Sequence, residues 1–179
     1  MVKLRSDLPE YFKSVGYTKG AEIGVYKGEF TELLCKAGLQ VYAIDPWMAY
    51  SEQPSQKRED FLYGHTQRQL KKYVNCKIIR KSSMEAVNDF EDESLDFVYI
   101  DGDHSFKAIA CDIVEWEKKV RKGGIISGHD YHGQSSQYVR VVVDAYVKAY
   151  NIKKLEVFGS KNGMKKRGDR HSSWLWIKE

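Results

Sequence analysis

The fold is decided by one stretch of sequence, Glu22-Ile23-Gly24-Val25-Tyr26-Lys27-Gly28, where a short apolar run leads into a turn with two glycines. The run predicts a buried strand over residues 21–25, followed by the start of a helix. Glycine in such a turn lets a ligand approach the backbone, and a helix amino terminus favours anionic or polar groups. The turn by itself is equally typical of an ordinary helix cap, because Tyr26 replaces the second glycine of the pattern G-x-G-x-x-G.

Asp45 favours the ligand-binding interpretation of this turn. It ends a second predicted strand over residues 41–45 and lies 21 positions after Gly24. A carboxylate at that point can accept hydrogen bonds from both ribose hydroxyls of an adenine nucleotide. Gly24 and Asp45 together therefore predict a nucleotide site at one edge of a sheet.

Strands and helices are predicted to alternate along most of the chain. Short apolar runs rich in Ile, Val and Tyr predict further buried strands at 77–80, 95–101 and 124–128. Segments of helical spacing lie between or after the strands, at 52–73, 109–120 and 139–150. This order implies right-handed βαβ units and an α/β, Rossmann-like, doubly wound sheet covered on both faces.

The end of the chain departs from this alternation. Two strand-like runs, 155–158 and 173–177, have no helical segment between them. Strands without a crossover helix pair antiparallel, so we expect an antiparallel hairpin at one edge of the sheet.

Composition fits one domain of 179 residues, with 42% hydrophobic and 30% charged residues. We divide it into an N-terminal helical segment (1–17), a cofactor-binding core (18–135) and a helix with the antiparallel hairpin (136–179). No apolar run is long enough to cross a membrane, and no secretory signal follows the charged N-terminus. The three cysteines are far apart and form no metal-binding pair, so a cytoplasmic protein is expected.

The formal net charge of +4 does not argue for nucleic acid as a partner. The excess lies in residues 161–170, which hold five basic residues and one acid. Two interpretations of this loop stay open: a solvated hairpin loop, or a lid or docking patch for an anionic substrate such as a nucleotide sugar, a phosphorylated metabolite or RNA. The sequence also leaves homo-oligomer formation open.

Two polar clusters follow the fourth and fifth predicted strands: Asp101-Gly102-Asp103-His104-Ser105 and Gly128-His129-Asp130-Tyr131-His132. Because the carboxyl ends of parallel strands border the ligand crevice, Asp101, His129 and Asp130 are expected to converge on one site. Two carboxylates and an imidazole suit Mg²⁺, Mn²⁺ or Fe²⁺. The alternatives are that Asp103 only caps the next helix, and that His129 and Asp130 only position a substrate or a loop.

In combination these motifs resemble class I S-adenosylmethionine-dependent methyltransferases. The resemblance is strongest to a small bacterial branch, methyltransferase family 24, with I-D-G-D-H-S at 100–105 and G-H-D-Y at 128–131. It spans residues 18–135, and the terminal hairpin also fits. The resemblance implies a seven-stranded sheet in the order 3-2-1-4-5-7-6, with six parallel strands and one antiparallel strand.

The resemblance also implies how S-adenosylmethionine is bound. The backbone at Gly24 would contact the methionine part of the cofactor with Glu22 beneath it, and Asp45 would hold the ribose. Pro46, Trp47, Ser83 and Met84 would border the adenine. The implied cofactor-binding residues are Glu22, Gly24, Val25, Tyr26, Gly28, Asp45, Pro46, Trp47, Ser83, Met84 and Asp101.

Metal-dependent O-methyltransferases of this fold carry metal ligands at positions that fall on Asp101, His129 and Asp130, although a histidine at 129 departs from their acidic or amide pattern. His104 stands where those enzymes often have a lysine, and it is the expected base, with Asp103 and His132 in reserve. The implied function is metal-assisted transfer of the sulfonium methyl group to a hydroxyl oxygen of a small molecule.

Three other functions remain compatible with these residues. A nicotinamide-dependent oxidoreductase would use the same nucleotide-binding half, although the missing G-x-G-x-x-G and the terminal hairpin argue against it. His129 with two aspartates also matches a ferrous-iron facial triad of an oxidoreductase. The third is a non-catalytic protein that binds S-adenosylmethionine without turnover.

Overall fold

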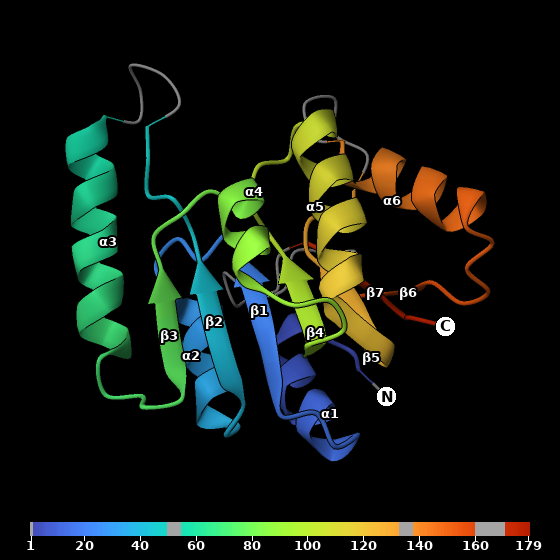
Figure 1. The fold of residues 1–179 in the computed structure, drawn as a ribbon, viewed down its shortest axis with the longest axis horizontal. Coiled ribbons are helices and arrows are strands. Elements are labelled where there is room, and N and C mark those ends of the chain that lie inside the picture. The colour runs from blue at the N-terminus through green and yellow to red at the C-terminus, as the bar shows by residue number, and fades with distance from the viewer. Residues whose placement is uncertain (1, 50–54, 133–137, 160–170) are drawn as a thin grey trace.

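Seven strands and six α-helices are found in the part of the chain that this computed structural model describes, residues 2–49, 55–132, 138–159 and 171–179 (Figure 1). The strands are β1 (Lys19–Ile23), β2 (Gln40–Ile44), β3 (Cys76–Ile79), β4 (Leu95–Ile100), β5 (Val120–Gly128), β6 (Glu156–Phe158) and β7 (Ser173–Ile177). The α-helices are α1 (Leu8–Ser14), α2 (Glu29–Lys36), α3 (Gln56–Leu70), α4 (Ser83–Ala86), α5 (Phe106–Lys119) and α6 (Val139–Ala149). Two short 3₁₀ helices are η1 (Arg5–Asp7) and η2 (Val87–Asp89).

All seven strands join one sheet in the order β3-β2-β1-β4-β5-β7-β6. The pairs among β1 to β5 are parallel, and β7 runs antiparallel to both β5 and β6. The predicted Rossmann-like sheet, with its order and its antiparallel strand, is therefore confirmed. The basic segment 161–170 lies outside the described residues, so both interpretations of it stay predictions.

β5 begins earlier than the apolar pattern predicts. Val120 was expected to extend an apolar helix face, but its backbone is extended (φ −87°, ψ 133°) and α5 ends at Lys119. Leu95 pairs with Val120 while Phe97 pairs with Ile125, so extra residues of β5 are accommodated at an irregularity in the ladder. The sequence pattern shows only the regular part of this strand.

Helices cover both faces of the sheet (Figure 1). Successive strand residues point to opposite faces, so Phe97 packs under α1 and α2 whereas Val98 packs under α5 and α6. The Phe12 ring of α1 lies on the Phe97 ring with their centroids 4.4 Å apart. On α3, Leu62 packs against Ala43 of β2. The two apolar layers hold the strand ends in fixed register.

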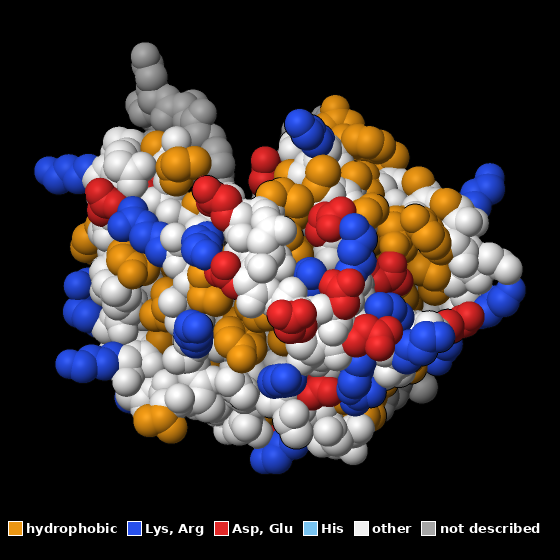
Figure 2. Space-filling model, in the orientation of Figure 1, with side chains coloured by type: hydrophobic (Ala, Val, Ile, Leu, Met, Phe, Trp, Pro, Cys, Tyr) orange, Lys and Arg blue, Asp and Glu red, His pale blue; other side chains and the backbone are white. Residues whose placement is uncertain are grey.

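Hydrophobic side chains also gather at the surface over α5 and α6 (Figure 2). The exposed ones on these helices include Val114, Val141 and Phe106. Within the described ranges, no helix combines the length and the apolar character that a membrane crossing requires.

Asp96 joins three segments at the end of the sheet opposite the polar clusters. Its Oδ2 accepts hydrogen bonds from the backbone N–H of Thr18 and Lys19, at 2.7 and 3.0 Å, and its Oδ1 accepts one from Arg121 Nε at 2.7 Å. Burial opposes ionisation of this carboxyl, but these hydrogen bonds hold its pKa below the usual value. Asp96 therefore fixes the start of β1 against β4 and β5.

Replacing Asp96 by alanine removes the acceptor of the backbone N–H groups of Thr18 and Lys19 and the ion-pair partner of Arg121. We expect Asp96→Ala to lower the free energy of unfolding by about 3 kcal/mol, measured by urea denaturation. Asp92→Ala is the matched control, because its carboxylate is exposed and pairs only with Lys119. Equal denaturation midpoints for the two variants would contradict this role of Asp96.

Candidate active site

The ends of four neighbouring strands bring the two polar clusters and the glycine turn into one row. Gly24, Asp45, Asp101 and His129 directly follow β1, β2, β4 and β5. Gly24, Asp101 and His129 each donate the backbone N–H to the last carbonyl of the adjacent strand, over 2.9, 2.7 and 3.0 Å. The carboxyl edge of the sheet is therefore the candidate site, as the sequence predicts.

Gly24 is held against the backbone of the neighbouring strand end. Its φ is +89°, a left-handed conformation that side chains rarely adopt. A Cβ at this position would lie 2.2 Å from the carbonyl oxygen of Asp101. Only glycine lets the first turn pass this close to the strand end that carries Asp101.

The Asp45 carboxylate holds the same turn from the other side. Its Oδ2 accepts the backbone N–H groups of Val25 and Tyr26 at 3.0 and 2.9 Å, and its Oδ1 accepts that of Trp47 at 2.7 Å. Burial raises the pKa of Asp45, although these hydrogen bonds oppose the rise. A carboxylate has about four acceptor positions, so roughly one remains for a ligand.

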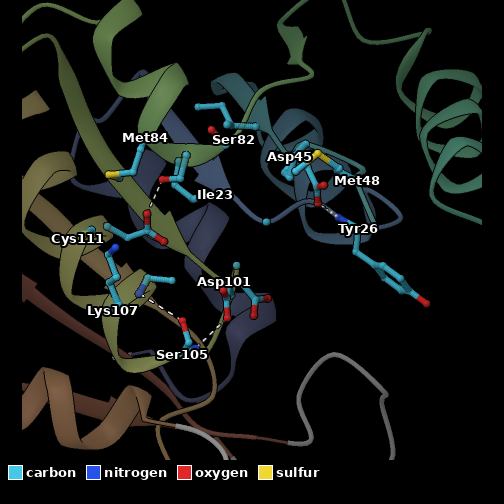
Figure 3. Close-up of a pocket in the computed structure, with 18 of the residues that line it drawn as sticks. Ile23, Tyr26, Asp45, Met48, Ser82, Met84, Asp101, Ser105, Lys107 and Cys111 are labelled. Carbon is cyan, nitrogen blue, oxygen red and sulfur yellow. Dashed lines mark hydrogen bonds between the residues drawn. The ribbon is translucent and has the colours of Figure 1, made fainter. Parts of the chain in front are cut away.

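A first cavity of about 640 Å³ opens between the glycine turn and α5. In Figure 3, Asp45 and Tyr26 lie on one side of it, and Ser105, Lys107 and Cys111 lie on the other. Eight predicted site residues line it: Gly24, Tyr26, Asp45, Pro46, Ser83, Met84, Asp101 and Asp103.

Asp112 lines the same cavity and was not predicted. This α5 residue is only 4% exposed, and it accepts a hydrogen bond from the Ser83 hydroxyl. Burial raises the pKa of Asp112 to about 6, against the opposing effect of that hydrogen bond. Its signal in the sequence is a lone carboxylate on the apolar face that carries Ile109, Ile113 and Trp116.

A second cavity of about 600 Å³ shares Gly24, Tyr26 and Asp101 with the first. Apolar residues of its wall include Val25, Phe30 and Leu33. Polar and charged residues of the wall include Arg5, Lys27, Glu29, His129, Asp130 and His171. The three shared residues form a junction between the two cavities.

Arg5, from η1, reaches into this second cavity. Its guanidinium lies 3.0 Å from Asp101 Oδ2 and 3.9 Å from Glu22 Oε1. Its Cζ is 4.5 Å from the centre of the Phe30 ring and 5.1 Å from that of Tyr99. Burial opposes the charge of Arg5, but Tyr99 and the carboxylates raise its pKa. No sequence signal marked Arg5, because the contact depends on where η1 packs.

Glu22 lies on the opposite side of β1 from the first cavity and lines neither cavity. Its side chain is 1% exposed, and it accepts a 2.5 Å hydrogen bond from the Thr31 hydroxyl. Burial raises the pKa of Glu22 to about 8, although Arg5 opposes the rise. Glu22 is therefore a weaker acid than an exposed glutamate, and it lies beside the Arg5 guanidinium.

Imidazoles surround the Asp130 carboxylate. Its Oδ2 lies 3.3 Å from His104 Nε2 and 3.4 Å from His129 Nδ1, and its Oδ1 lies 3.6 Å from His132 Nε2. Burial opposes ionisation of Asp130, but His129, His104 and His171 lower its pKa to about 2. Asp130 is therefore a fixed negative charge in a cluster of histidines.

A family model described as a methyltransferase domain matches residues 21–131, more than half of the chain and all of the row just described. The chain belongs to this family. The resemblance to S-adenosylmethionine-dependent methyltransferases that the motifs predict is thereby confirmed.

Solved methyltransferases share the fold of this methyltransferase domain. An O-methyltransferase from Bacillus cereus in complex with SAH has a TM-score of 0.69 and 15% identity, covering 97% of this chain and 80% of that one. An rRNA methylase from Streptococcus thermophilus has a TM-score of 0.69 and 16% identity, covering 99% and 98%. At these identities the likeness shows the fold alone.

One curated relative is matched by sequence, an uncharacterized protein of Sinorhizobium fredii called y4gI. It is 25% identical over 116 residues, which make up 61% of this chain and 12% of that protein. The methyltransferase domain therefore spans only a small part of this relative's length.

Besides Glu22, the predicted cofactor-binding residues Trp47 and Gly28 line neither cavity, and Val25 lines only the second. The Trp47 ring is 1% exposed and lines neither cavity; its Nε1 donates to the Tyr26 carbonyl at 2.9 Å. Gly28 begins α2 with a φ of +77°, and a Cβ there would lie 3.1 Å from the Thr66 side chain of α3. Both residues support the glycine turn from behind instead of bordering the adenine or the methionine part.

The predicted catalytic residues Asp103, His104 and His132 take up different positions around the site. Asp103 Oδ1 accepts the backbone N–H of Ser105 at 2.9 Å, as a residue at the start of a helix does, and Asp103 lines only the first cavity. His104 and His132 are not among the residues that line either cavity, whereas His129 lines the second. The loop geometry after β4, which the sequence does not reveal, turns His104 toward Asp130.

The predicted metal ligands Asp101, His129 and Asp130 do lie together. His129 Nδ1 is 3.7 Å from Asp101 Oδ1 and 3.4 Å from Asp130 Oδ2. However, the buried guanidinium of Arg5 already holds Asp101 Oδ2, and a divalent cation there would meet a like charge where little water screens it. These three residues therefore do not fit a divalent cation, and no chemical step is assigned to one at this position.

The close contact at Gly24 predicts a sharp difference between two glycine variants. Gly24→Ala adds a Cβ that overlaps the Asp101 carbonyl, whereas Gly16 has a similar φ of +86° with nothing within 4 Å of its Cβ position. We expect Gly24→Ala to lower the free energy of unfolding by at least about 3 kcal/mol and Gly16→Ala by about 1 kcal/mol. Urea denaturation measures both, and equal losses would contradict a steric role for Gly24.

Proposed function

We propose that this chain is an S-adenosylmethionine-dependent methyltransferase that methylates a hydroxyl oxygen of a small molecule. The observation that carries the proposal is the junction of the two cavities at Gly24, Tyr26 and Asp101. A cofactor in the first cavity would present its methyl group at this junction to an acceptor in the second. Holding the two reactants in line is the main contribution a methyltransferase makes.

The first cavity supports the cofactor assignment through its polar groups. The free acceptor position of Asp45 suits one ribose hydroxyl, and Glu59 of α3 lines the same cavity as a second acceptor. At the α5 side, the buried Asp112 carboxylate suits the exocyclic amine of adenine, beside Met84 and Cys111. An ionised acceptor strengthens a hydrogen bond from an amine.

The second cavity suits a small acceptor with an apolar body. Phe30 and Leu33 form part of its wall, and its volume is in the range of small-molecule sites. The hydroxyl to be methylated would lie at the polar end, near Asp101 and His129. Lys27 lines the same cavity and would favour an acceptor that carries a negative charge.

We assign the proton to His129. Its Nδ1 faces the Asp130 carboxylate, and its Nε2 is buried without a hydrogen-bond partner among the described residues. The acceptor oxygen attacks the methyl carbon, the carbon–sulfur bond breaks, and its electron pair stays on sulfur as a neutral thioether. The hydroxyl proton passes to His129 Nε2, while Asp130 stabilises the resulting imidazolium.

The role of Asp112 predicts how cofactor affinity depends on pH. Above its pKa of about 6 the carboxylate accepts the adenine amine, and below that pH the protonated carboxyl competes for the same position. We expect the affinity for S-adenosylhomocysteine, measured by calorimetry, to weaken about tenfold as the pH falls below this pKa. In Asp112→Asn the affinity should be lower at neutral pH and nearly independent of pH.

Glu91→Gln, at an exposed carboxylate, is the control and should keep the pH dependence of the parent protein. If S-adenosylhomocysteine binds with the same pH profile to Asp112→Asn, the adenine assignment is wrong. If S-adenosylhomocysteine does not bind to the parent protein at any pH, the proposed function itself fails.

The proton assignment predicts a split between binding and turnover. With labelled S-adenosylmethionine and a panel of phenols and hydroxy acids, we expect label to be transferred to oxygen. His129→Gln should lower kcat by about 10²–10⁴-fold with little change in affinity for S-adenosylhomocysteine. His65→Gln, at a histidine of α3 outside both cavities, should leave kcat unchanged.

Two results would contradict this assignment. Transfer of label to amines but not to hydroxyl groups would exclude the oxygen acceptor. A full kcat in His129→Gln at saturating acceptor would show that another group takes the proton.

A further inference from the structure

The two oxygens of Asp130 face different groups. Its Oδ2 is directed to His104 and His129, at 3.3 and 3.4 Å. Its Oδ1 is directed to His132 Nε2, at 3.6 Å. The proton assignment above uses only the Oδ2 side, so the Oδ1 side is free for a different role.

His171 lies two residues before the start of β7 and belongs to the same cluster as Asp130 and His132. One ligand atom each from Asp130, His132 and His171 lies within 4.8 Å of the others. The rings of His132 and His171 have their centroids 4.8 Å apart. Four of the five histidines in the sequence therefore gather around a single carboxylate.

The His132 ring lacks the hydrogen bonds that a purely structural histidine would make. Both of its ring nitrogens are buried and have no hydrogen-bond partner among the described residues. Buried polar atoms are normally paired, so these nitrogens point to a group that is bound between the side chains. A metal ion would account for the unpaired His132 nitrogens beside a carboxylate oxygen and the second imidazole of His171.

We propose that Asp130, His132 and His171 bind a first-row transition metal of the Zn²⁺ or Fe²⁺ type. Donors of a tetrahedral site stand roughly 3.3 Å apart, close to the observed 3.6 Å between Asp130 Oδ1 and His132 Nε2. Two imidazoles with one carboxylate suit these metals, whereas Mg²⁺ prefers oxygen ligands. Of the three predicted metal ligands, only Asp130 belongs to this set.

The charges beside each carboxylate favour a metal at Asp130 over a metal at Asp101. The Arg5 guanidinium neutralises Asp101 at 3.0 Å, whereas Asp130 is faced by imidazoles. The contacts of Asp130 Oδ2 with His104 and His129 would orient the carboxylate as a ligand. Asp130 and His171 also line the second cavity, so a metal held by them would lie at the wall of the proposed acceptor cavity.

The test titrates the full chain with Co²⁺ and follows the visible d–d absorption of the bound ion. We expect a saturable signal that Zn²⁺ abolishes and that Mg²⁺ in large excess does not. His132→Ala and His171→Ala should each weaken Co²⁺ binding by at least about tenfold. Asp101→Asn, which leaves the three ligands in place, should bind Co²⁺ like the parent chain.

His65→Ala is the matched control, because it removes a histidine outside the cluster and should leave the signal unchanged. Circular dichroism checks that each variant is folded, and His132→Gln replaces any alanine variant that is not. Unchanged Co²⁺ binding in both His132 and His171 variants, loss of binding in Asp101→Asn, or displacement by Mg²⁺ would each overturn the proposal. This readout does not depend on methyl transfer, so the two proposals can fail separately.

Discussion

The approach of Gly24 to the Asp101 carbonyl is the contact on which the whole site depends. It requires a residue without a Cβ at φ +89°, and it requires β1 and β4 to end at the same level. The apolar layers on both faces of the sheet fix that level, and Asp96 fixes the opposite end of β1. Because the turn passes so close to the strand end, the two cavities share Gly24, Tyr26 and Asp101 as lining residues.

Charge at the carboxyl edge is balanced within the chain itself. Arg5 pairs with Asp101, burial raises the pKa of Glu22, and imidazoles surround Asp130. Buried carboxylates would otherwise be costly, since each loses its hydration. Two groups of charged side chains therefore lie along this edge of the sheet. Near the junction of the cavities the Arg5 guanidinium pairs with Asp101, and farther along the edge histidines surround Asp130. This separation is the basis of our proposals that His129 takes the proton and that Asp130, His132 and His171 bind a metal.

The sequence predicts the fold well and the site in part, and the reasons are physical. Apolar runs predict the strands and their alternation with helices, and the family resemblance implies the strand order. Neither shows the irregularity that lengthens β5 from Val120. Residues that end strands, such as Asp45 and Asp101, are placed correctly because the sheet itself positions them. Trp47 and Arg5 depend instead on how loops and the N-terminal segment pack, which local patterns do not encode. Asp112 could have been found, as a carboxylate on an apolar helix face.

The central claim is that the cofactor and the acceptor occupy separate cavities that meet at Gly24. A crystal structure of the chain with S-adenosylhomocysteine tests it most directly. We expect the adenine beside Asp112, the ribose at Asp45 and the thioether sulfur at the junction with Gly24 and Asp101. An adenine found instead against Phe30 and Leu33, in the second cavity, would contradict it.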